Sequence, residues 1–535
     1  MGNGAYIYVN GTNNTLTLDS TTTVSGDANI YTDGSSGTAI TNAGTITHTS
    51  GSGSIYSLNL TNSGTITATG GSYLYLGYPS ASYNTTNTGS VTADGSGTYV
   101  YLRGPFDNNG TLTAQNSGNL LWDGTNTTAN LGSVVLTGGG RARLNGTLNN
   151  ASATLNAPTG GAFDLYGGTI TGGTIATGAL GFTTSGGYLD GTTLNGDLNL
   201  SVSSSYVRFL NGTNFTGTNA TLANNTGLYW QQTGTLSGKT ITQGSGSYLY
   251  VTGAGNTLTL DPTTTVTGSL GIYTDTSTGT AITNQGVLTH NSGTGYLYAN
   301  TLVNQGSVAV TGGNLYFGYY ASHNSTNAVG GSLTLTGTSN VHIYSPLSNA
   351  GQINVQSGTL YTNGYLTNAT TGLINGAGTI NGGLTLAGGT LAPGNSIGTL
   401  TLSGGNFTVT NSSTFAIEMD GTTSDRLTFQ SPGTVDIGVG LLQLSINLLA
   451  APTQGTTYTI MNIASGGTGY TGYFAGLPNS GDAMIANFSG TDYTLNVYYL
   501  ANSIVLQVPE PSTYALLSMG LAVFALRLRR RWRQE

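Results

Sequence analysis

The residues of this chain that could bind or transform a ligand are few, and three carboxylates stand closest together. Glu418, Asp420 and Asp425 fall within eight residues around Gly421. Oxygen ligands at such spacing could hold Ca²⁺, although an EF-hand has a different spacing and the calcium-binding repeat Gly-Gly-x-Gly-x-Asp is absent. Acidic turn residues between two strands would explain the same pattern. Calcium binding near these three residues therefore stays an open alternative.

The remaining charged residues do not predict a catalytic site. Asp19 and Asp33 recur at matching repeat positions as Asp261 and Asp275. A single active site would not be duplicated, so we interpret these aspartates as turn or cap residues. The chain has one lysine, Lys239, and the arginines of its body are scattered at positions Arg103, Arg141, Arg143, Arg208 and Arg426. With no phosphate loop or nucleophile elbow in the sequence, we predict no catalytic residues, no cofactor and no enzyme.

Histidine and cysteine usage gives no metal site either. His48 and His290 occupy equivalent positions in two distant repeats, so a shared metal site is not expected. We predict both as solvent-facing strand residues. The absence of cysteine excludes disulfide scaffolds and thiolate metal sites, and is compatible with an extracellular location.

Tyrosine is abundant, with 32 residues, and it alternates along the chain. Alternation puts residues of the same parity on one face of a strand. We predict that these tyrosines form a stacked ladder, with a flat aromatic strip that packs on sugar rings as the alternative. The alternating groups are Tyr73, Tyr75 and Tyr78, then Tyr248 and Tyr250, and, in the matching place, Tyr316, Tyr319 and Tyr320.

Threonine follows a second alternating pattern. The steps Thr45-Ile46-Thr47 and Thr65-Ile66-Thr67 are similar to the flat threonine arrays of ice-binding β-helices. Ordinary strand propensity predicts the same pattern, so ice or crystal binding is an alternative rather than the main reading.

The composition indicates a long, repetitive β-structure that positions these residues. The chain has 535 residues, 86 of them Gly, and only 6% are charged. Hydrophobic residues still make 37% and alternate regularly, which flexible Gly/Ser linkers lack. Residues 1–508 hold 17 acidic and 6 basic side chains, a net charge of −11. The basic footprint of a nucleic-acid-binding protein is absent, so we expect no nucleic-acid partner.

Two nested repeats predict the fold. The segment Asn14 to Asp19 returns 242 residues later as Asn256 to Asp261. Within this long repeat, the motif Asn-x-Gly-x-(Ile/Leu/Val)-x begins at Asn42, Asn62 and Asn87, and again at Asn284, Asn304 and Asn349. Asn-x-Gly gives a turn that tolerates positive φ, and Thr-Ile-Thr gives a short strand with one apolar side chain inward.

One turn and strand every 20 to 25 residues is typical of a parallel β-solenoid. We predict an all-β fold, a right-handed parallel β-solenoid, over a stack of hairpins or several β-sandwiches. The segment Gly388 to Leu402 resembles the region near the C-terminal end of autotransporter-type β-helix passengers. The predicted domains are 1–245 and 246–404 as two solenoid blocks, 405–508 as a β-rich cap, and 509–535 as a tail.

The tail has the order of a membrane-engaging segment. Pro509, Glu510 and Pro511 precede an apolar run, and five arginines follow it. Ser512 to Leu526 is 15 residues, about 22 Å of helix. That length is short of the roughly 20 residues a bilayer prefers, but long arginines can snorkel. The positive-inside rule keeps the arginines in the cytoplasm and the body outside. These stop residues are Arg527, Arg529, Arg530, Arg531 and Arg533.

This order resembles the PEP-CTERM sorting signal of bacterial surface proteins. The resemblance implies that an exosortase-like protease of the inner membrane recognises the motif Pro509, Glu510, Pro511. It also implies a membrane-anchored precursor, about residues 512–526 forming the transmembrane helix, and then a place at the cell surface or in the extracellular matrix. Such export requires a signal peptide. Met1 opens directly into the strand-like Ala5 to Val9, so we expect the true start to lie upstream.

These observations favour an exported, non-enzymatic surface or matrix protein. We expect a structural or adhesive role, in association with exopolysaccharide or a biofilm. A β-helix lyase or hydrolase acting on polysaccharide and an ice- or crystal-binding protein are the alternatives.

Overall fold

The fold is a right-handed parallel β-solenoid of about 18 turns, as predicted. The computed structural model describes residues 1–2, 4–319, 322–465, 467, 469–510, 522–523, 525–527 and 529. It contains two compact units, Met1–Leu258 and Thr259–Glu535, and the division falls inside β36 (Thr257–Leu260). Strands of successive turns pair in parallel, so the alternatives of stacked hairpins and sandwiches are wrong.

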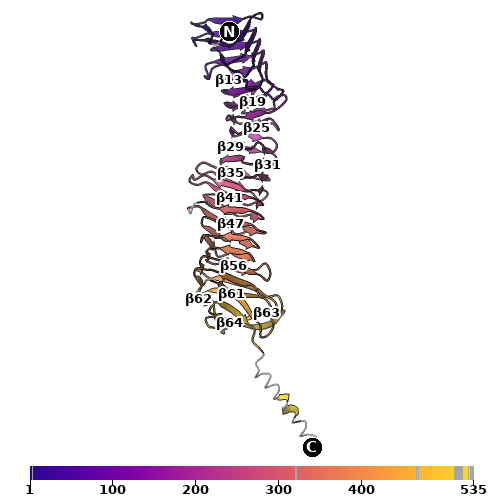
Figure 1. The fold of residues 1–535 in the computed structure, drawn as a ribbon, viewed down its shortest axis with the longest axis vertical. Coiled ribbons are helices and arrows are strands. Elements are labelled where there is room, and N and C mark those ends of the chain that lie inside the picture. Colours follow the sequence, from indigo (N-terminus) through magenta and orange to yellow (C-terminus); the bar gives the residue numbers. More distant parts are fainter. Residues whose placement is uncertain are drawn as a thin grey trace. The chain divides into compact units, whose positions relative to one another are not determined.

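In the N-terminal half of the first unit, each turn contributes one strand to each of three sheets. The strands stack turn upon turn in Figure 1. Sheet A contains β1 (Ile7–Val9), β4 (Asn29–Thr32), β7 (Ser52–Tyr56), β10 (Tyr73–Leu76), β13 (Tyr99–Arg103), β16 (Asn119–Asp123), β19 (Arg141–Leu144), β22 (Phe163–Leu165) and β25 (Leu180–Phe182). Sheet B contains β2 (Thr15–Leu18), β5 (Ala39–Asn42), β8 (Asn59–Asn62), β11 (Asn84–Asn87) and β14 (Phe106–Asn108). Sheet C contains β3 (Thr23–Gly26), β6 (Thr45–His48), β9 (Thr65–Ala68), β12 (Ser90–Asp94), β15 (Thr111–Gln115) and β18 (Ser133–Leu136).

The sheets change in the second half of this unit, after a 3₁₀ helix at Thr128–Leu131. Sheets B and C end at β14 and β18, and sheet A ends at β25. Sheet D contains β17 (Thr125–Thr127), β20 (Thr147–Asn149), β23 (Thr169–Thr171), β26 (Tyr188–Asp190), β29 (Tyr206–Leu210), β32 (Gly227–Gln231) and β35 (Tyr248–Val251). Sheet E contains β21 (Thr154–Leu155), β24 (Thr174–Ile175), β27 (Thr193–Leu194) and β30 (Asn214–Phe215). Sheet F contains β28 (Leu198–Leu200), β31 (Asn219–Leu222), β33 (Gly234–Leu236) and β34 (Thr240–Gln243).

The core consists of columns of apolar side chains that repeat from turn to turn. In sheet C, the in-register residues Ile46, Ile66, Val91 and Leu112 are at most 1% exposed. Alternation along each strand sends every second side chain inward. Each such side chain contributes about 1.5–3 kcal/mol by leaving water, so the columns hold successive turns together.

The asparagines of the Asn-x-Gly motif form a second inward column. In sheet B, the Nδ2 of Asn42 donates to the Oδ1 of Asn62, and Asn62 donates to Asn87, both at 2.7 Å. Asn108 continues the column. These four residues are at most 2% exposed. A buried amide must find a hydrogen-bond partner, and these amides bond to one another along the column. We name this column the asparagine ladder.

The glycines of the same motif differ from the prediction. Gly44, Gly64 and Gly89 do not have positive φ, so the turn does not require glycine for its torsion angles. A Cβ on Gly64 would lie 2.1 Å from the carbonyl oxygen of Gly44, and one on Gly89 would lie 2.1 Å from that of Gly64. Glycine is needed because successive turns approach closely at this point.

The predicted exposure of the two repeat histidines is wrong. His48 and His290 are fully buried. The Nδ1 of His48 accepts a hydrogen bond from the Ala28 N–H at 3.1 Å, and that of His290 accepts one from Leu270 at 3.3 Å. Each buried histidine thus accepts a hydrogen bond from the backbone N–H of a turn.

The second unit has two long sheets. Sheet G contains β38 (Gly271–Thr274), β41 (Thr294–Tyr298), β44 (Asn314–Phe317), β47 (Asn340–Ile343), β50 (Thr359–Tyr361), β53 (Thr379–Asn381), β56 (Thr399–Ser403) and β59 (Arg426–Gln430). Sheet H contains β37 (Thr265–Gly268), β39 (Ala281–Asn284), β40 (Val287–His290), β42 (Thr301–Asn304), β43 (Ser307–Val310), β45 (Asn324–Asn327), β46 (Ser332–Leu335), β48 (Leu347–Asn349), β49 (Gln352–Val355), β51 (Leu366–Asn368), β52 (Leu373–Gly376), β54 (Leu384–Leu386), β55 (Thr390–Pro393), β57 (Phe407–Val409), β58 (Ser413–Met419), β60 (Val435–Leu448) and β62 (Thr471–Phe474). A second asparagine ladder runs through Asn284, Asn304, Asn327, Asn349 and Asn368.

Antiparallel pairing appears at the end of this unit, in the region predicted as a cap. β61 (Thr457–Ser465) pairs with β65 (Ser503–Gln507), and β64 (Thr491–Leu500) pairs with both β63 (Ala483–Phe488) and β65. Antiparallel pairing thus follows the parallel stacking at this end of the unit, and the capping role of residues 405–508 stays a prediction.

The predicted transmembrane helix at about 512–526 lies mostly outside the described residues. Residues 522–523, 525–527 and 529 are helical. Within the ranges that the structure describes, no helix has the length and apolar character needed to cross a membrane.

Candidate functional site

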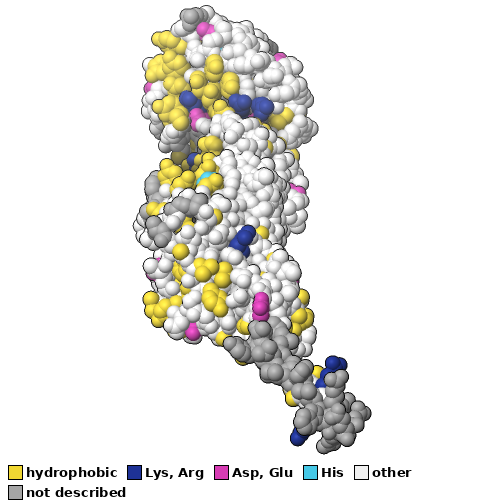
Figure 2. Space-filling model, turned by 60° about the horizontal axis from the view of Figure 1, so that its bottom comes forward, with side chains coloured by type: hydrophobic (Ala, Val, Ile, Leu, Met, Phe, Trp, Pro, Cys, Tyr) yellow, Lys and Arg dark blue, Asp and Glu magenta, His cyan; other side chains and the backbone are white. Residues whose placement is uncertain are grey.

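Tyrosines cover the outward face of sheet A. Parallel pairing in register places Tyr8 beside Tyr31 and Tyr31 beside Tyr56, while Tyr75 lies beside Tyr101. A neighbouring column joins Tyr73 to Tyr99. Figure 2 shows hydrophobic side chains gathered on one side of the first unit, with Lys and Arg side chains beside them. We call the outward tyrosines of β1, β4, β7, β10 and β13 the aromatic face; its members are Tyr8, Tyr31, Tyr56, Tyr73, Tyr75, Tyr99 and Tyr101.

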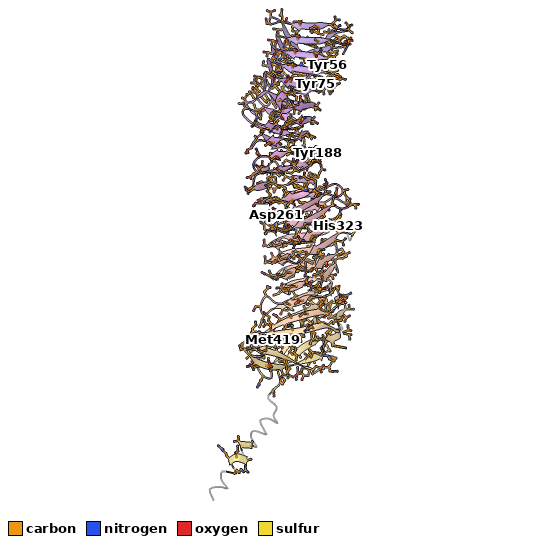
Figure 3. All side chains as sticks on the ribbon, turned by 180° about the vertical axis from the view of Figure 1, so that it is seen from behind. Tyr56, Tyr75, Tyr188, Asp261, His323 and Met419 are labelled. Carbon is orange, nitrogen blue, oxygen red and sulfur yellow. The ribbon has the colours of Figure 1, made fainter. Side chains whose placement is uncertain are left out.

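Ring geometry confirms the predicted ladder. The rings of Tyr31 and Tyr56 lie 5.2 Å apart at 11°, and those of Tyr75 and Tyr101 lie 4.7 Å apart at 27°. Figure 3 labels Tyr56 and Tyr75, which project from the same side of the unit. Stacked rings direct their edges and hydroxyl groups outward. Burial raises the pKa of Tyr56 and Tyr101, so these hydroxyls are uncharged at neutral pH and can donate and accept hydrogen bonds.

Arginines that are scattered in the sequence gather among the tyrosines. The guanidinium of Arg103 lies 4.0 Å from the centre of the Tyr75 ring. That of Arg143 lies 4.6 Å from the Tyr166 ring, and its Nη1 donates to the Tyr99 hydroxyl at 3.2 Å. These contacts fix the cations against aromatic rings. The spacing of the two arginines along the sequence does not reveal this grouping, because they come from different turns.

A second tyrosine group lies on sheet D of the same unit. Register places Tyr188 beside Arg208, Arg208 beside Tyr229, and Tyr229 beside Tyr250. The Arg208 guanidinium lies 4.7–4.9 Å from the rings of Tyr188, Tyr206 and Tyr229. One cation is therefore shared by three aromatic rings.

Sheet G of the second unit carries its own ladder. Tyr296, Tyr316, His342 and Tyr361 follow one another in register. The His342 ring lies 4.7 Å from Tyr316 and 4.5 Å from Tyr361, with interplanar angles of 11° and 1°. Burial lowers the pKa of His342, so the ladder is neutral here. The predicted partner Tyr320 lies outside the described residues.

The repeated aspartates have the structural role that the sequence indicated. The Oδ1 of Asp19 accepts hydrogen bonds from the backbone N–H and the hydroxyl of Thr21, and Asp261 does the same with Thr263. The carboxylate of Asp33 accepts from the N–H groups of Gly11 and Ser35. These carboxylates cap turns.

Two of the three carboxylates near Gly421 are held by backbone groups, and the third, Glu418, accepts from the Asn447 side-chain amide. Asp420 accepts from the N–H groups of Thr422 and Thr423. Asp425 is buried and accepts from Gly398 and Glu418, both at 2.8 Å. Burial raises the pKa of Asp425 to about 6. Among the side chains that the structure describes, no group of three or more His, Cys, Asp or Glu residues is arranged to hold a metal ion.

The tail motif begins where the last strand loses its partners. The N–H of Val508 donates to Thr456, and the N–H of Gly455 donates back to Val508, at 3.0 and 2.9 Å. The next residue, Pro509, is half-buried, and Glu510 is exposed. Pro511, Arg530, Arg531 and Arg533 lie outside the described residues, while Arg527 and Arg529 are exposed.

Residues 507–531 match the PEP-CTERM protein-sorting motif. The PEP-CTERM match covers the predicted motif residues and four of the five arginines. It implies exosortase-dependent export of an extracellular, surface-located protein. Comparison with curated proteins found no match to this chain. The PEP-CTERM motif therefore identifies a sorting route, and the assignment of motif and stop residues to individual roles stays a prediction.

Proposed function

We propose that this chain is a non-enzymatic surface protein whose aromatic face binds polysaccharide outside the cell. The observation that carries the proposal is the in-register array of tyrosines on sheet A, with Arg103 and Arg143 packed against it. The PEP-CTERM motif supports the location, because a sorted protein meets polysaccharide at the cell surface.

The aromatic face suits a polysaccharide for two physical reasons. Rows of tyrosine hydroxyls offer donors and acceptors at the strand repeat of about 4.8 Å, and the ring edges between them are apolar. The rings are already stacked, so binding costs little side-chain entropy. A long polymer can then contact several turns at once, which suits an adhesive or structural role in a matrix.

The absence of catalysis is part of the proposal. The carboxylates of the repeats cap turns, and Asp425 is occupied by two backbone N–H groups. Incubation with a panel of polysaccharides, followed by assays for new reducing ends and unsaturated products, should give none. Release of such products by the wild type, and its loss in Asp425→Asn, would favour the lyase or hydrolase alternative.

Binding is tested by electrophoresis of the full chain, in mild detergent, through gels that contain soluble polysaccharides. The triple variant Tyr31→Ala, Tyr56→Ala, Tyr101→Ala should bind about tenfold or more weakly, because each ring contributes about 0.5–1.5 kcal/mol beyond its buried area. The matched control replaces Thr47, Thr67 and Thr92 by Ala on sheet C of the same unit. Equal migration of the wild type with and without every polysaccharide would refute the proposal.

A second candidate function rests on sheet C. Its outward residues form two columns in register, one of them Ser25, Thr47, Thr67, Thr92 and Thr113, and the other Thr23, Thr45, Thr65, Ser90 and Thr111. Regular hydroxyl rows favour binding to an ordered crystal surface such as ice. The measurement is thermal hysteresis. Hysteresis in the wild type that is lost in the double variant Thr67→Leu, Thr92→Leu would support this candidate. Absence of hysteresis in the wild type would refute it.

A further inference from the structure

A hollow of about 890 Å³ lies in the first unit where sheet A ends. β25 is the last strand of sheet A, and the following turn does not add a strand to it. The hollow is lined by residues of β19, β22 and β25 and by Asn195, Asp197 and Asn199. We call it the sheet-end groove. Its volume falls within the range of small-molecule sites, about 300–1,000 Å³.

The column of sheet A that carries Tyr75 and Tyr101 leads into this groove. From Tyr101 the register passes to Leu121, then to Arg143, then to Asp164 and finally to Gly181. Leu121 is buried, and the hydrogen bond from Arg143 to the Tyr99 hydroxyl joins the groove to the aromatic face. The aromatic face and the groove therefore lie along one column of sheet A.

The charged groups of the groove are fixed and balanced. The Nη1 of Arg141 donates to the Oδ2 of Asp164 at 2.9 Å, and the Nε of Arg143 lies 3.8 Å from the same oxygen. Asp197 also lines the groove, and it accepts hydrogen bonds from the Asn219 backbone N–H and side-chain amide at 2.9 and 3.1 Å. Two guanidinium groups and two carboxylates thus line the groove. Such neighbouring donors and acceptors suit hydrogen bonding to the hydroxyl groups of a sugar.

Gly181 keeps this groove open. Its φ is not positive, and a Cβ added there would meet the Asp164 Oδ1 at 3.5 Å, an ordinary contact. Neither backbone torsion nor close packing therefore requires glycine at this position. The consequence of glycine is that position 181 adds no side chain over the Asp164 carboxylate, which lines the groove and is 16% exposed.

We propose that the sheet-end groove binds uncharged sugar units of the polysaccharide that lies on the aromatic face. This proposal rests on the proposed function and adds the place and the class of the ligand. Balanced arginines and aspartates, together with amide and hydroxyl groups, recognise sugar hydroxyls and offer no net charge to a uronate. The net charge of −11 over residues 1–508 also repels polyanions.

The test measures binding of the full chain to hydroxyethylcellulose and galactomannan, which are neutral, and to alginate, which is a polyuronate. Gly181→Trp fills the groove, and Arg141→Gln removes an exposed donor without changing the backbone. Each should weaken binding of a neutral polymer about tenfold, equivalent to about 1.4 kcal/mol. Asn59→Trp, at an exposed position of β8, is the matched control and should bind as the wild type does. Circular dichroism checks that each variant is folded.

The outcomes separate this proposal from the proposed function. One outcome is that the wild type binds the neutral polymers, the tyrosine triple variant does not, and both groove variants still do. The proposal for the aromatic face is then supported, and the proposal for the groove is refuted. If alginate binds and both neutral polymers do not, the ligand class is wrong. If none of the polymers binds the wild type, both proposals fail together.

Discussion

At the scale of single residues, the buried asparagine is the most informative side chain. Asn62 accepts a hydrogen bond from Asn42, and its own amide donates to Asn87 at 2.7 Å and to the Ser90 carbonyl at 3.2 Å. Both groups of the Asn62 side chain are thus satisfied inside the core. A polar residue in this place fixes the register between turns, because a shift of one residue would break the whole column.

Removal of one member of the ladder should destabilise the protein. Asn62→Ala leaves the Asn42 donor and the Asn87 acceptor without their partner, at a cost of about 1–3 kcal/mol for each buried group. The measurement is the midpoint of urea unfolding followed by circular dichroism. Asn59→Ala is the control, since Asn59 is an exposed residue on the same strand, β8. Equal midpoints for the two variants would contradict this role of the ladder.

Asp425 should give the stability an unusual pH dependence. Burial raises its pKa from 3.8 to about 6 in the folded protein, so the folded state binds the proton more tightly than the unfolded state. The favourable contribution is complete below about pH 4 and is lost as the pH rises through 6. The free energy of unfolding of the wild type, relative to that of Asp425→Asn, should therefore decrease as the pH rises from about 4 to 6.

Asp420 provides the control for this measurement. The N–H groups of Thr422 and Thr423 lower the pKa of Asp420, so its contribution is present above the usual carboxylate pKa and is lost as the pH falls. Relative to Asp420→Asn, the wild type should lose stability toward acid pH. Parallel pH profiles for the two variants would contradict the assignment to Asp425.

At the scale of elements, the separation between successive turns depends on glycines that no larger residue can replace. Gly64→Ala would place a methyl group 2.1 Å from the Gly44 carbonyl oxygen, so two turns must move apart and the variant should unfold at a lower urea concentration. Gly181→Ala is the matched control, because its nearest contact is 3.5 Å. It should leave stability unchanged or raise it by up to about 1 kcal/mol, through a lower entropy of the unfolded chain. Equal losses in both variants would show that close approach is not the reason for Gly64.

The alternation of side chains along each strand predicts which of them point inward. The wrong prediction for His48 shows how this rule applies. Ile46 was correctly placed inward in the strand Thr45–His48. His48 is two residues later, so the same alternation also sends it inward, where it accepts the Ala28 N–H. Polarity suggested an exposed histidine, but the period of the strand decided its position. The same parity sends Asn42 inward after Ile40.

At the scale of the whole molecule, the fold class followed from the repeats, whereas the candidate site did not. A turn of constant type every 20 to 25 residues predicts a solenoid, but turn lengths vary, so the sequence does not reveal which residues align across turns. Arg143 comes beside Asp164 and Gly181 only through the register of β19, β22 and β25. The end of sheet A, which creates the groove, has no counterpart in the repeat pattern.

The sorting of the whole chain depends on a segment that begins directly after its last strand. Pro509 follows Val508, whose N–H is the last to bond to the body of this unit within residues 469–510. Each proline favours an extended conformation in the residue before it, which suits access by a protease. Pro509→Ala with Pro511→Ala should therefore leave the protein in the membrane fraction, with its C-terminal peptide intact by mass spectrometry. Pro478→Ala, an exposed proline in the same unit, should be processed normally. Release of the double variant at the wild-type rate would show that the Pro-Glu-Pro sequence is not the recognised feature, and would leave the apolar run and arginines as the signal.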